Sequence, residues 1–589
     1  MELLMGNEAI AMGALAAGVQ FVSGYPGTPS TEVLETVAKR RPEHVYVEWS
    51  VNEKAALEVA AGAALAGARA MVTMKQVGLN VASDPLMCLN YIGVKGALVV
   101  VVADDPGPIS SQTEQDTRHF ARYARIPVFD PQTPEQAYRM VKDAFEWSEK
   151  YHTPVILRPT TRVCHGCAAM EVEEPAPARE IEGFVKDDSK WVIFPRTSFL
   201  AKKRLFAQET EFADALSEYS ENCIWGEGKL GIATGGGTAA YVKENDLPAK
   251  YFAVGTPWPF PEKKALEFLE GLDAVLVLEE LDPVIEDALI AVCGKYRLDV
   301  RILGKRTGDV PVAGELSVES AGACMRKFLG IECAEEKPAE MPALPVRPPV
   351  LCAGCPHRGS FYAVKQALKG RKAVFSGDIG CYTLGNAAPL NMVDTCLCMG
   401  AGVTMAQGLA RMEKDTVHVA FIGDSTFFHS GIPGVVNALY NNADEIIVVL
   451  DNSTTAMTGH QPHPGIGKTM MGGVQPAISP VEVLKALGVK TWRANALNLE
   501  EAKSAICEAA EETGVRAVVL ESPCIAIVKK KAAMAIDRDK CIGCKKCVRE
   551  IGCPAISIEG GKARIDKTLC TGCTLCAQIC PVKCIGKEA

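Results

Sequence analysis

The chain has 589 residues, of which 48% are hydrophobic and 23% are charged, the balance of a globular protein with several domains. Its formal net charge of -9 argues against a nucleic-acid backbone as the main partner. The chain begins without a basic leader, and its most apolar run, Ala97–Ala103, is far shorter than the roughly 20 residues of a membrane span. We therefore expect a cytoplasmic protein without membrane or nucleic-acid partners, whose cysteines bind metals or do redox chemistry.

The first predicted domain, residues 1–175, alternates apolar strands with helical patterns. Val99–Ala103 and Pro154–Arg158 are typical of strands, and Thr133–Lys150 is typical of a helix. This alternation predicts a mostly parallel sheet covered by helices. Asn52–Ala68 predicts a helix of small residues that can pack closely against a neighbour.

The second predicted domain, residues 180–333, is a further α/β unit. A strand at Leu230–Thr234 leads into Gly235-Gly236-Gly237-Thr238. The glycine run lacks the full G-x-G-x-x-G pattern, so we interpret it as a strand-to-helix turn rather than a nucleotide loop. Residues 334–350 are rich in proline and charge and predict an interdomain linker.

The third predicted domain, residues 351–530, places polar residues after two strands. Val417–Ile422 precedes Gly423-Asp424-Ser425, and Ile446–Leu450 precedes Asp451-Asn452-Ser453-Thr454. Carboxyl ends of parallel strands meet at the edge of a sheet where ligands bind. The Asp424 carboxylate, the Asn452 amide oxygen and the Thr454 carbonyl form an oxygen set that suits Mg²⁺.

This pattern resembles the thiamine diphosphate motif, in which a Gly-Asp pair is followed about thirty residues later by asparagine. The chain has GDS and DN where GDG and NN are commoner, and the alternative is that Asp424 and Asn452 merely cap strand ends. A helix opening at Gly400-Ala401-Gly402 offers N–H groups to a phosphate. Thiamine enzymes also need a glutamate at N1′ of the pyrimidine, and Glu53 heads the small-residue helix. A helix N-terminal glutamate is otherwise explained by the helix dipole.

The tail, residues 533–589, holds nine of the 23 cysteines in "CIGCKKCVREIGCP", "CTGCTLCAQICP" and the later Cys584. Each run has thiols at i, i+3 and i+6 and a later Cys-Pro, the pattern of a two-cluster ferredoxin whose Cys-Pro thiol ligates the other cluster. One predicted [4Fe-4S] set is Cys541, Cys544, Cys547 and Cys580, and the other is Cys570, Cys573, Cys576 and Cys553. Short strands at Ala555–Glu559 and Ala563–Asp566 flank a glycine turn. The alternative is two structural zinc sites.

Two details of the tail depart from the expected pattern. Five residues, Val548–Gly552, precede the first Cys-Pro, whereas the usual number, three, precedes the second. The ligand assignment tolerates the longer loop, but the loop amides influence the cluster potential. Cys584 is left over, and we expect an unliganded thiol.

Taken together, the chain resembles the 2-oxoacid:ferredoxin oxidoreductase family, in particular the large subunits that act on indolepyruvate. The resemblance covers nearly the whole chain and rests on seven features. They are SGYPGTPSTEVLE (Ser23–Glu35), NEKAALEVAAGAALAGAR (Asn52–Arg69), CAGCPHRG (Cys352–Gly359), GDIGCYTLG (Gly377–Gly385), GDSTFFHSGIPG (Gly423–Gly434), LDNSTTAMTGHQPHPG (Leu450–Gly465) and the two-cluster tail.

The resemblance implies three doubly wound α/β domains of the thiamine-enzyme type and a small ferredoxin-like domain. Residues 1–175 would bind the pyrimidine, 180–333 would be transketolase-C-terminal-like, and 351–530 would bind diphosphate and Mg²⁺. The implied reaction is oxidative decarboxylation of an aryl 2-oxo acid with coenzyme A to an acyl-CoA and CO₂, reducing ferredoxin. A smaller beta subunit would complete a heteromer, two copies of each.

The resemblance also assigns residues. Glu53 would contact N1′, and Asp424, Asn452 and Thr454 would hold the magnesium ion. His429 and His460 would lie near the active centre, for proton transfer or carboxylate binding, with buried hydrogen-bonded histidines as the alternative. The loop at the substrate and cofactor cleft would consist of Tyr25, Pro26, Thr28 and Ser30.

A third [4Fe-4S] cluster beside the thiamine is implied by a dispersed set of cysteines, with buried structural cysteines as the alternative. The set is Cys352, Cys355, Cys381 and Cys524. Cys164 and Cys167 lack further ligands, and we interpret them as structural or as an incidental surface pair.

Three other functions stay open at this stage. The substrate could be a branched-chain or pyruvate-like 2-oxo acid. A non-redox thiamine lyase would share the α/β domains without using the tail, and an electron-transfer module would use the tail without the thiamine site.

Overall fold

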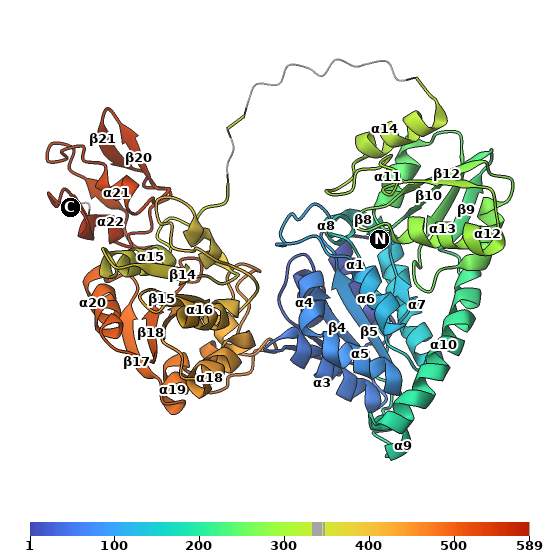
Figure 1. Cartoon of the computed structure of the whole chain (residues 1–589), viewed down its shortest axis with the longest axis horizontal. Helices are drawn as coiled ribbons and strands as arrows, with labels where there is room; N and C mark the ends of the chain where they lie inside the picture. Colours follow the sequence, from blue (N-terminus) through green and yellow to red (C-terminus); the bar gives the residue numbers. More distant parts are fainter. Residues whose placement is uncertain (333–343, 346–347, 588–589) are drawn as a thin grey trace. The chain divides into compact units, whose positions relative to one another are not determined.

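The structure is a computed structural model that describes residues 1–332, 344–345 and 348–587, apart from the side chain of Asp188. The chain divides into two compact units, Met1–Ala339 and Glu340–Ala589, and each is treated by itself (Figure 1). The linker predicted at 334–350 lies for most of its length outside the described residues. Among the described helices, none combines the length and the hydropathy needed to cross a bilayer.

The first unit begins with a six-stranded sheet in the order β3-β2-β4-β5-β7-β6, in which every paired strand is parallel. The strands are β2 (Phe21–Gly24), β3 (Tyr46–Trp49), β4 (Arg69–Lys75), β5 (Ala97–Ala103), β6 (Val128–Phe129) and β7 (Val155–Leu157). Helices cover the two faces, so β5 is buried along its whole length. This explains why Ala97–Ala103 is apolar without alternation.

One face of this sheet packs against α3 to α6, and α1, α2 and α7 form a second group. The helices are α1 (Gly6–Ala16), α2 (Thr31–Arg40), α3 (Glu53–Leu65), α4 (Gln76–Val81), α5 (Ser83–Ile92), α6 (Thr117–Ala124) and α7 (Pro134–Tyr151). A short antiparallel pair, β1 (Glu2–Met5) and β8 (Cys167–Met170), and the helix α8 (Thr161–His165) complete the domain.

After α9 (Asp188–Trp191) and α10 (Pro195–Ser217), a second sheet follows in the order β13-β12-β10-β11-β9, with only β9 antiparallel. Its strands are β9 (Cys223–Gly226), β10 (Leu230–Gly235), β11 (Lys250–Val254), β12 (Ala274–Leu278) and β13 (Arg301–Leu303). Its helices are α11 (Thr238–Asn245), α12 (Glu262–Leu269), α13 (Val284–Tyr296) and α14 (Val318–Leu329). The run Gly235–Thr238 is the strand-to-helix turn that the sequence predicts, with Gly236 at φ +55.

A buried ion pair joins the two sheets of the first unit at their carboxyl edges. Arg118 lies 2.6 Å from Asp116 and 2.6 Å from Glu279, which follows β12. Within the first sheet, Arg158, which follows β7, lies 2.7 Å from Asp104, which follows β5. The ends of β5 and β7 thus carry buried ion pairs, whereas the ends of β2 and β3 carry the predicted cofactor residues.

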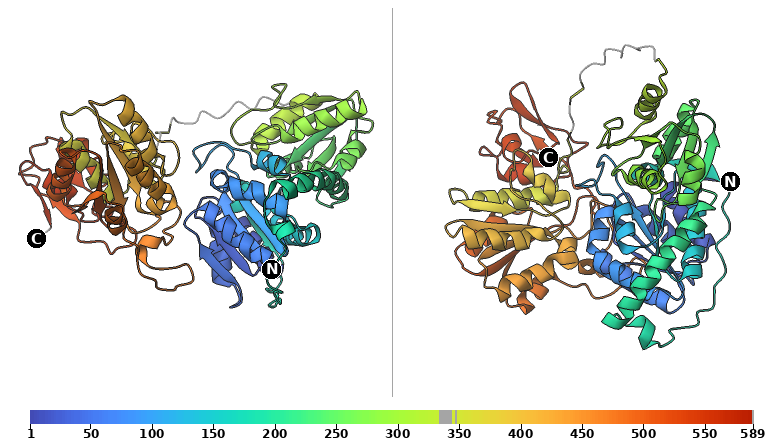
Figure 2. Two further views of the ribbon diagram at one scale, coloured as in Figure 1. Left: turned by 60° about the horizontal axis from the view of Figure 1, so that its bottom comes forward. Right: turned by 45° about the vertical axis from the view of Figure 1, so that its right-hand side comes forward.

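The second unit contains a parallel five-stranded sheet in the order β14-β15-β16-β18-β17. Its strands are β14 (Ala373–Ser376), β15 (Val417–Gly423), β16 (Glu445–Asp451), β17 (Lys490–Asn495) and β18 (Val515–Glu521). Its helices are α15 (Pro356–Ala367), α16 (Ala401–Met412), α17 (Asp424–Thr426), α18 (Ile432–Tyr440), α19 (Pro480–Ala486) and α20 (Leu499–Ala510). Helices lie on both faces of this sheet (Figure 2).

Alternate residues of the central strands face two separate cores. Phe421 and Val448 pack with α15 and α20, whereas Ile422 and Val449 pack with α16, α18 and α19. Burial on both faces explains the continuous apolar runs of β15 and β16. The predicted α/β class with parallel sheets is therefore confirmed.

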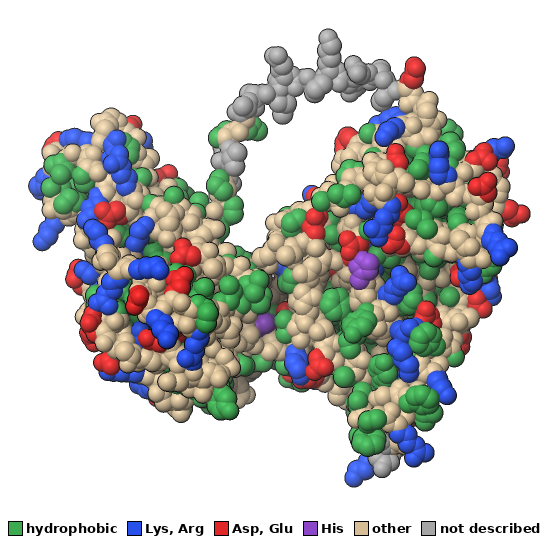
Figure 3. All heavy atoms as spheres, viewed as in Figure 1, with side chains coloured by type: hydrophobic (Ala, Val, Ile, Leu, Met, Phe, Trp, Pro, Cys, Tyr) green, Lys and Arg blue, Asp and Glu red, His purple; other side chains and the backbone are tan. Residues whose placement is uncertain are grey.

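The tail forms a small domain in which each cysteine run contains a helix of four residues, α21 (Lys546–Arg549) and α22 (Leu575–Gln578). The strands β20 (Ile556–Glu559) and β21 (Lys562–Ile565) pair as an antiparallel hairpin, and β19 (Met534–Ile536) pairs with β22 (Ile585–Lys587). Gly560 and Gly561, both with positive φ, make the hairpin turn. On the face shown in Figure 3, basic and acidic side chains are interspersed.

Candidate functional site

The ends of β15 and β16 bring the predicted magnesium residues together. Asp424 Oδ2 accepts a hydrogen bond from the Asn452 backbone N–H at 3.1 Å, and Asn452 Oδ1 accepts one from the Thr454 backbone N–H at 3.1 Å. All three residues are buried. Ser425, the next residue of the motif, donates its backbone N–H to Asp424 Oδ1 at 2.8 Å. The structure thus holds a carboxylate, an amide and nearby backbone carbonyls at one sheet edge, a donor set that fits a hard cation such as Mg²⁺.

Two glycines of the predicted phosphate region are fixed by a carboxylate that sequence reasoning missed. Asp378 accepts the N–H of Gly400 at 2.8 Å and the N–H of Gly423 at 3.2 Å. Gly400 has φ +79, and a Cβ there would overlap Ser430. Gly402 lies in the first turn of α16, where a Cβ would meet the Gly377 carbonyl oxygen at 2.6 Å. The backbone therefore approaches closely at this helix start, as a diphosphate site requires.

Histidines differ in their relation to this edge. His429 is buried in a π-helical turn, and its Nδ1 lies 3.1 Å from Ser430 Oγ. His460 is exposed on the loop after β16, with φ +69, so it is not a buried histidine in this unit. His463, which was not predicted, is buried with Nε2 3.2 Å from Asp424 Oδ2. His357, also not predicted, is buried with Nε2 3.4 Å from Asn452 Nδ2.

The predicted pyrimidine contact, Glu53, is the first residue of α3 in the first unit. The Asn52 side chain accepts the Ala55 backbone N–H at 2.8 Å and caps the helix, which therefore starts one residue later than predicted. Glu53 is buried, and its carboxylate packs against Gly78, where a Cβ would meet Glu53 Oε1 at 2.6 Å. Burial lowers the pKa of Lys75, and Asp105 and Glu53 oppose that shift. The glutamate is thus shielded from solvent and acts electrostatically on Lys75.

The predicted cleft loop follows β2 at the same carboxyl edge. Tyr25 and Pro26 are buried, and Thr28 is partly exposed. Ser30 Oγ donates to the Gly27 carbonyl at 2.9 Å, and the Thr28 carbonyl accepts from Ser110 Oγ at 3.3 Å. These two hydrogen bonds, one within the loop and one from Ser110, hold the loop at the sheet edge where Glu53 also lies.

All four members of the dispersed cysteine set, Cys352, Cys355, Cys381 and Cys524, lie in the second unit. Burial raises the pKa of Cys355 to about 12, with Cys352 and Cys381 adding to the shift, and raises that of Cys381 to about 11, with Cys524 and Cys352 adding. Each of these shifts therefore involves other thiols of the set. The Cys524 N–H donates to the Asn452 carbonyl at 2.8 Å, so the set adjoins the magnesium residues.

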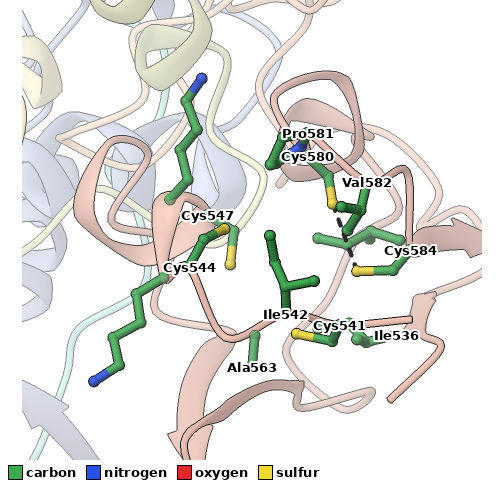
Figure 4. Close-up of a pocket in the computed structure, with 13 residues that line it drawn as sticks. Ile536, Cys541, Ile542, Cys544, Cys547, Ala563, Cys580, Pro581, Val582 and Cys584 are labelled. Carbon is green, nitrogen blue, oxygen red and sulfur yellow. Dashed lines mark hydrogen bonds between the residues drawn. The ribbon is translucent and has the colours of Figure 1, made fainter. Parts of the chain in front are cut away.

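The first tail set, Cys541, Cys544, Cys547 and Cys580, lines one pocket (Figure 4). Ile536, Ile542 and Val582 supply apolar walls. Cys584, expected to be left over, is buried in the same pocket with its Sγ 3.5 Å from that of Cys580. The pocket therefore holds five thiols, of which four are predicted ligands.

The second tail set is Cys553, Cys570, Cys573 and Cys576. Burial raises the pKa of Cys576 to about 12, and Cys573, Cys553, Cys570 and, from the first tail set, Cys547 add to the shift. The crossing pattern, in which Cys553 of the first run joins the thiols of the second, stays a prediction. Such a set fits a cubic cluster, in which each thiolate binds a different iron atom.

No three His, Cys, Asp or Glu side chains in the described ranges group tightly enough around one metal ion. The two cysteines of the CHGC segment differ in their exposure to solvent. Cys164 is buried and Cys167 is exposed at the start of β8. Of the residues that were missed, Asp378, His357 and His463 all lie inside the quoted motifs. Asp378 closely follows β14, and that position was the signal that could have found it. His357 lies in α15 and His463 in the loop after β16, where no local signal singles them out.

Three family models match the chain. Residues 12–219 match the pyruvate flavodoxin/ferredoxin oxidoreductase thiamine diphosphate-binding family, 378–520 match the C-terminal thiamine pyrophosphate-binding domain of thiamine pyrophosphate enzymes, and 533–581 match the 4Fe-4S dicluster domain. The fold and these sites define a thiamine diphosphate-dependent, iron-sulfur oxidoreductase of the 2-oxoacid:ferredoxin class.

Curated relatives narrow the family. The chain is 41% identical over 570 residues to indolepyruvate oxidoreductase subunit IorA of Methanothermobacter thermautotrophicus, covering 93% of this chain and 91% of the relative. It is 40% identical over 592 residues to the subunit of the same name from Pyrococcus horikoshii, covering 93% and 90%. The chain belongs to the family of indolepyruvate oxidoreductase subunit IorA.

More distant similarities cover part of the chain. The 2-oxoglutarate synthase subunit KorA of Archaeoglobus fulgidus is 26% identical over 315 residues, 47% of this chain and 88% of the relative. A solved 2-oxoglutarate:ferredoxin oxidoreductase from Magnetococcus marinus is 19% identical, covers 56% of this chain and 65% of that one, and superposes with a TM-score of 0.45.

Proposed function

We propose that the chain is the large subunit of an enzyme that oxidatively decarboxylates aryl 2-oxo acids of the indolepyruvate class. The products would be an aryl-acyl-CoA, CO₂ and reduced ferredoxin, in a heteromer with a smaller beta subunit. The observation that carries this proposal is the match to relatives named indolepyruvate oxidoreductase along nearly their whole length. The thiol-rich tail further supports work in the reducing cytoplasm.

In this proposal the third sheet binds the cofactor through its strand ends. Asp424, Asn452 and Thr454 would hold Mg²⁺ and, through it, the diphosphate, and the start of α16 at Gly400 and Gly402 would face the phosphates. When bound, thiamine diphosphate supplies a nucleophile and an electron sink. The hydrogen bonds that Asp424 and Asp378 accept from backbone N–H groups support this role because they hold both strand ends and the start of α16 in place.

Glu53 would bond N1′ of the cofactor and hold its aminopyrimidine in the reactive tautomer. Its burial against Gly78 supports a fixed position for the carboxylate. His429 and His460 are proposed for proton transfer or for binding the substrate carboxylate. Tyr25, Pro26 and Thr28, which follow β2 in the first unit, would line the substrate and cofactor cleft on the side of Glu53.

Electrons would leave through iron-sulfur clusters. The proposal assigns one cluster to the first tail set, one to the second tail set and a third to the dispersed set. The pocket shared by the first tail set and the influence of the thiols on one another within the other two sets support the assignment, as does the hydrogen bond from the Cys524 N–H to the Asn452 carbonyl at the proposed cofactor edge.

The test is anaerobic purification of the complex with its beta subunit, followed by counts of iron, sulfide and thiamine diphosphate and by substrate-dependent dye reduction with coenzyme A. About twelve irons per chain, one thiamine and fastest reduction with indolepyruvate are the expected results. About eight irons would remove the third cluster. Zinc, absence of thiamine, or product formation without dye reduction would overturn the proposal. Faster turnover with a branched-chain acid or pyruvate would move the substrate class.

A further inference from the structure

A buried arginine lies between the dispersed set and the second tail set. Arg358, in α15, is 3% exposed. Its Nη1 donates to the Ile551 carbonyl at 2.9 Å and to the Gly552 carbonyl at 2.8 Å, and its Nη2 donates to the Leu351 carbonyl. One guanidinium therefore holds the residue before Cys352 and the two residues before Cys553.

The acceptors on the tail side belong to the unusually long loop Val548–Gly552. Gly552 has φ +62, and a Cβ there would lie 3.5 Å from Arg358 Nη1 and would overlap Pro389. The Tyr362 hydroxyl, one turn further along α15, lies 2.7 Å from the Glu550 carboxylate in the same loop. The longer loop, Val548–Gly552, thus forms the surface through which the tail contacts α15.

Besides the contacts through Arg358, the loops that carry the two thiol sets contact each other directly. Gly354, between Cys352 and Cys355, packs against Thr571, which lies between Cys570 and Cys573, so closely that a Cβ on Gly354 would overlap the threonine hydroxyl. Gly359 packs against Leu575, where a Cβ would meet the leucine Cδ2 at 3.1 Å.

The thiols of both sets also influence the pKa of the Arg358 guanidinium. Burial lowers the pKa of Arg358, and Cys553, Cys355, Cys352 and Cys573 oppose that shift. An arginine stays charged in such surroundings because its intrinsic pKa is very high. Cys553 and Cys573 belong to the second tail set, and Cys355 and Cys352 belong to the dispersed set, so thiols of both sets act on this guanidinium.

We propose that Arg358 is a positioning residue of the electron path, which docks the tail and raises the reduction potential of the two clusters it separates. The inference rests on the proposed clusters. A cluster gains one negative charge on reduction, so a fixed buried cation favours the reduced form. One electron would pass from the dispersed-set cluster, which would be oxidised, to the second-tail-set cluster, which would be reduced. A cation shared by both would raise both potentials.

The test uses the complex with its beta subunit and electron paramagnetic resonance during titration with a chemical reductant, which needs no substrate. Arg358→Gln removes the charge, and Arg358→Lys keeps it but loses the planar fork. Lys365→Gln is the matched control, because Lys365 lies on the same helix and donates to the carbonyls of Pro389 and Leu390 at 2.8 and 2.7 Å.

We expect Arg358→Gln to lower the midpoint potential of the two facing clusters by about 59 mV or more, a tenfold change in a one-electron equilibrium. Arg358→Lys should restore most of the shift, and Lys365→Gln should leave the potentials unchanged. A full iron content with unchanged potentials in Arg358→Gln would overturn the proposal, as would equal shifts in the Gln and Lys variants.

Arg358→Met is the second neutral variant, since its unbranched side chain keeps the packing. If both neutral variants lose iron and Arg358→Lys keeps it, the requirement for charge stands. Loss of iron in all three would reduce Arg358 to a structural contact and overturn the proposal. The iron count and substrate oxidation of the unmodified complex test the proposed function separately.

Discussion

The eight predicted tail ligands lie within residues 541–580, whereas the four dispersed cysteines are spread from Cys352 to Cys524. In the tail, short loops and a hairpin bring the thiols together, and local spacing is enough to predict the sets. The dispersed set depends on the third sheet, because Cys381 follows β14 and Cys524 follows β18. Local chain geometry thus specifies one kind of site and tertiary folding the other. The two should respond differently to mutation.

The largest expected effect is on substrate oxidation, which can be lost while both kinds of thiol site stay intact. Glu53→Gln should reduce 2-oxo acid oxidation by at least about 100-fold, because an amide cannot favour the reactive tautomer of the cofactor. Iron content and the chemically reduced spectra of all clusters should stay unchanged. Turnover assays and iron counts on the same preparation check this. Normal turnover in the variant would remove Glu53 from the mechanism.

The next effect concerns the two kinds of site directly. Cys355→Ser should remove about four irons per chain and leave the tail spectra intact, since the tail sets close locally. Cys576→Ser should remove about four irons and leave the dispersed-set signal. Iron analysis and paramagnetic resonance distinguish the two losses. If Cys355→Ser leaves iron unchanged, the four dispersed cysteines are structural.

The same contrast explains what the sequence could predict. Apolar runs such as Ala97–Ala103 reveal strands because both faces of those strands are buried. The tail sets follow from spacing alone. His357 and His463 could not be singled out, because their value depends on which strand ends the fold places beside Asn452 and Asp424. The docking role of Val548–Gly552 was invisible for the same reason.

The contact between the loop of the dispersed set and the loop of the second tail set can be weakened by adding one methyl group. Gly354→Ala should destabilise the second unit by about 1–3 kcal/mol, because Gly354 has φ +77 and the new Cβ overlaps Thr571. Thr571→Ala removes the overlapping hydroxyl and should recover part of this loss in the double variant. Denaturation of the iron-loaded complex, followed by cluster absorbance, measures the coupling. Additive losses would show that the two loops do not contact each other.

The smallest effect on turnover is expected from a change at the amino end of β16, in the sheet and outside the thiol sets. Glu445 is fully buried, and burial raises its pKa from the ordinary 4.5 to about 8. The folded chain therefore keeps a proton that the unfolded chain releases above pH 4.5. The stabilisation from this group is complete below pH 4.5 and is lost as the pH rises towards and through 8, by up to roughly 1.4 kcal/mol per unit. Glu445→Gln should flatten this decline without changing turnover, as measured by denaturation between pH 5 and 8. If the slope persists in Glu445→Gln, other buried carboxyls of the sheet set the pH dependence of the unit, foremost Asp451, whose pKa burial raises to about 6.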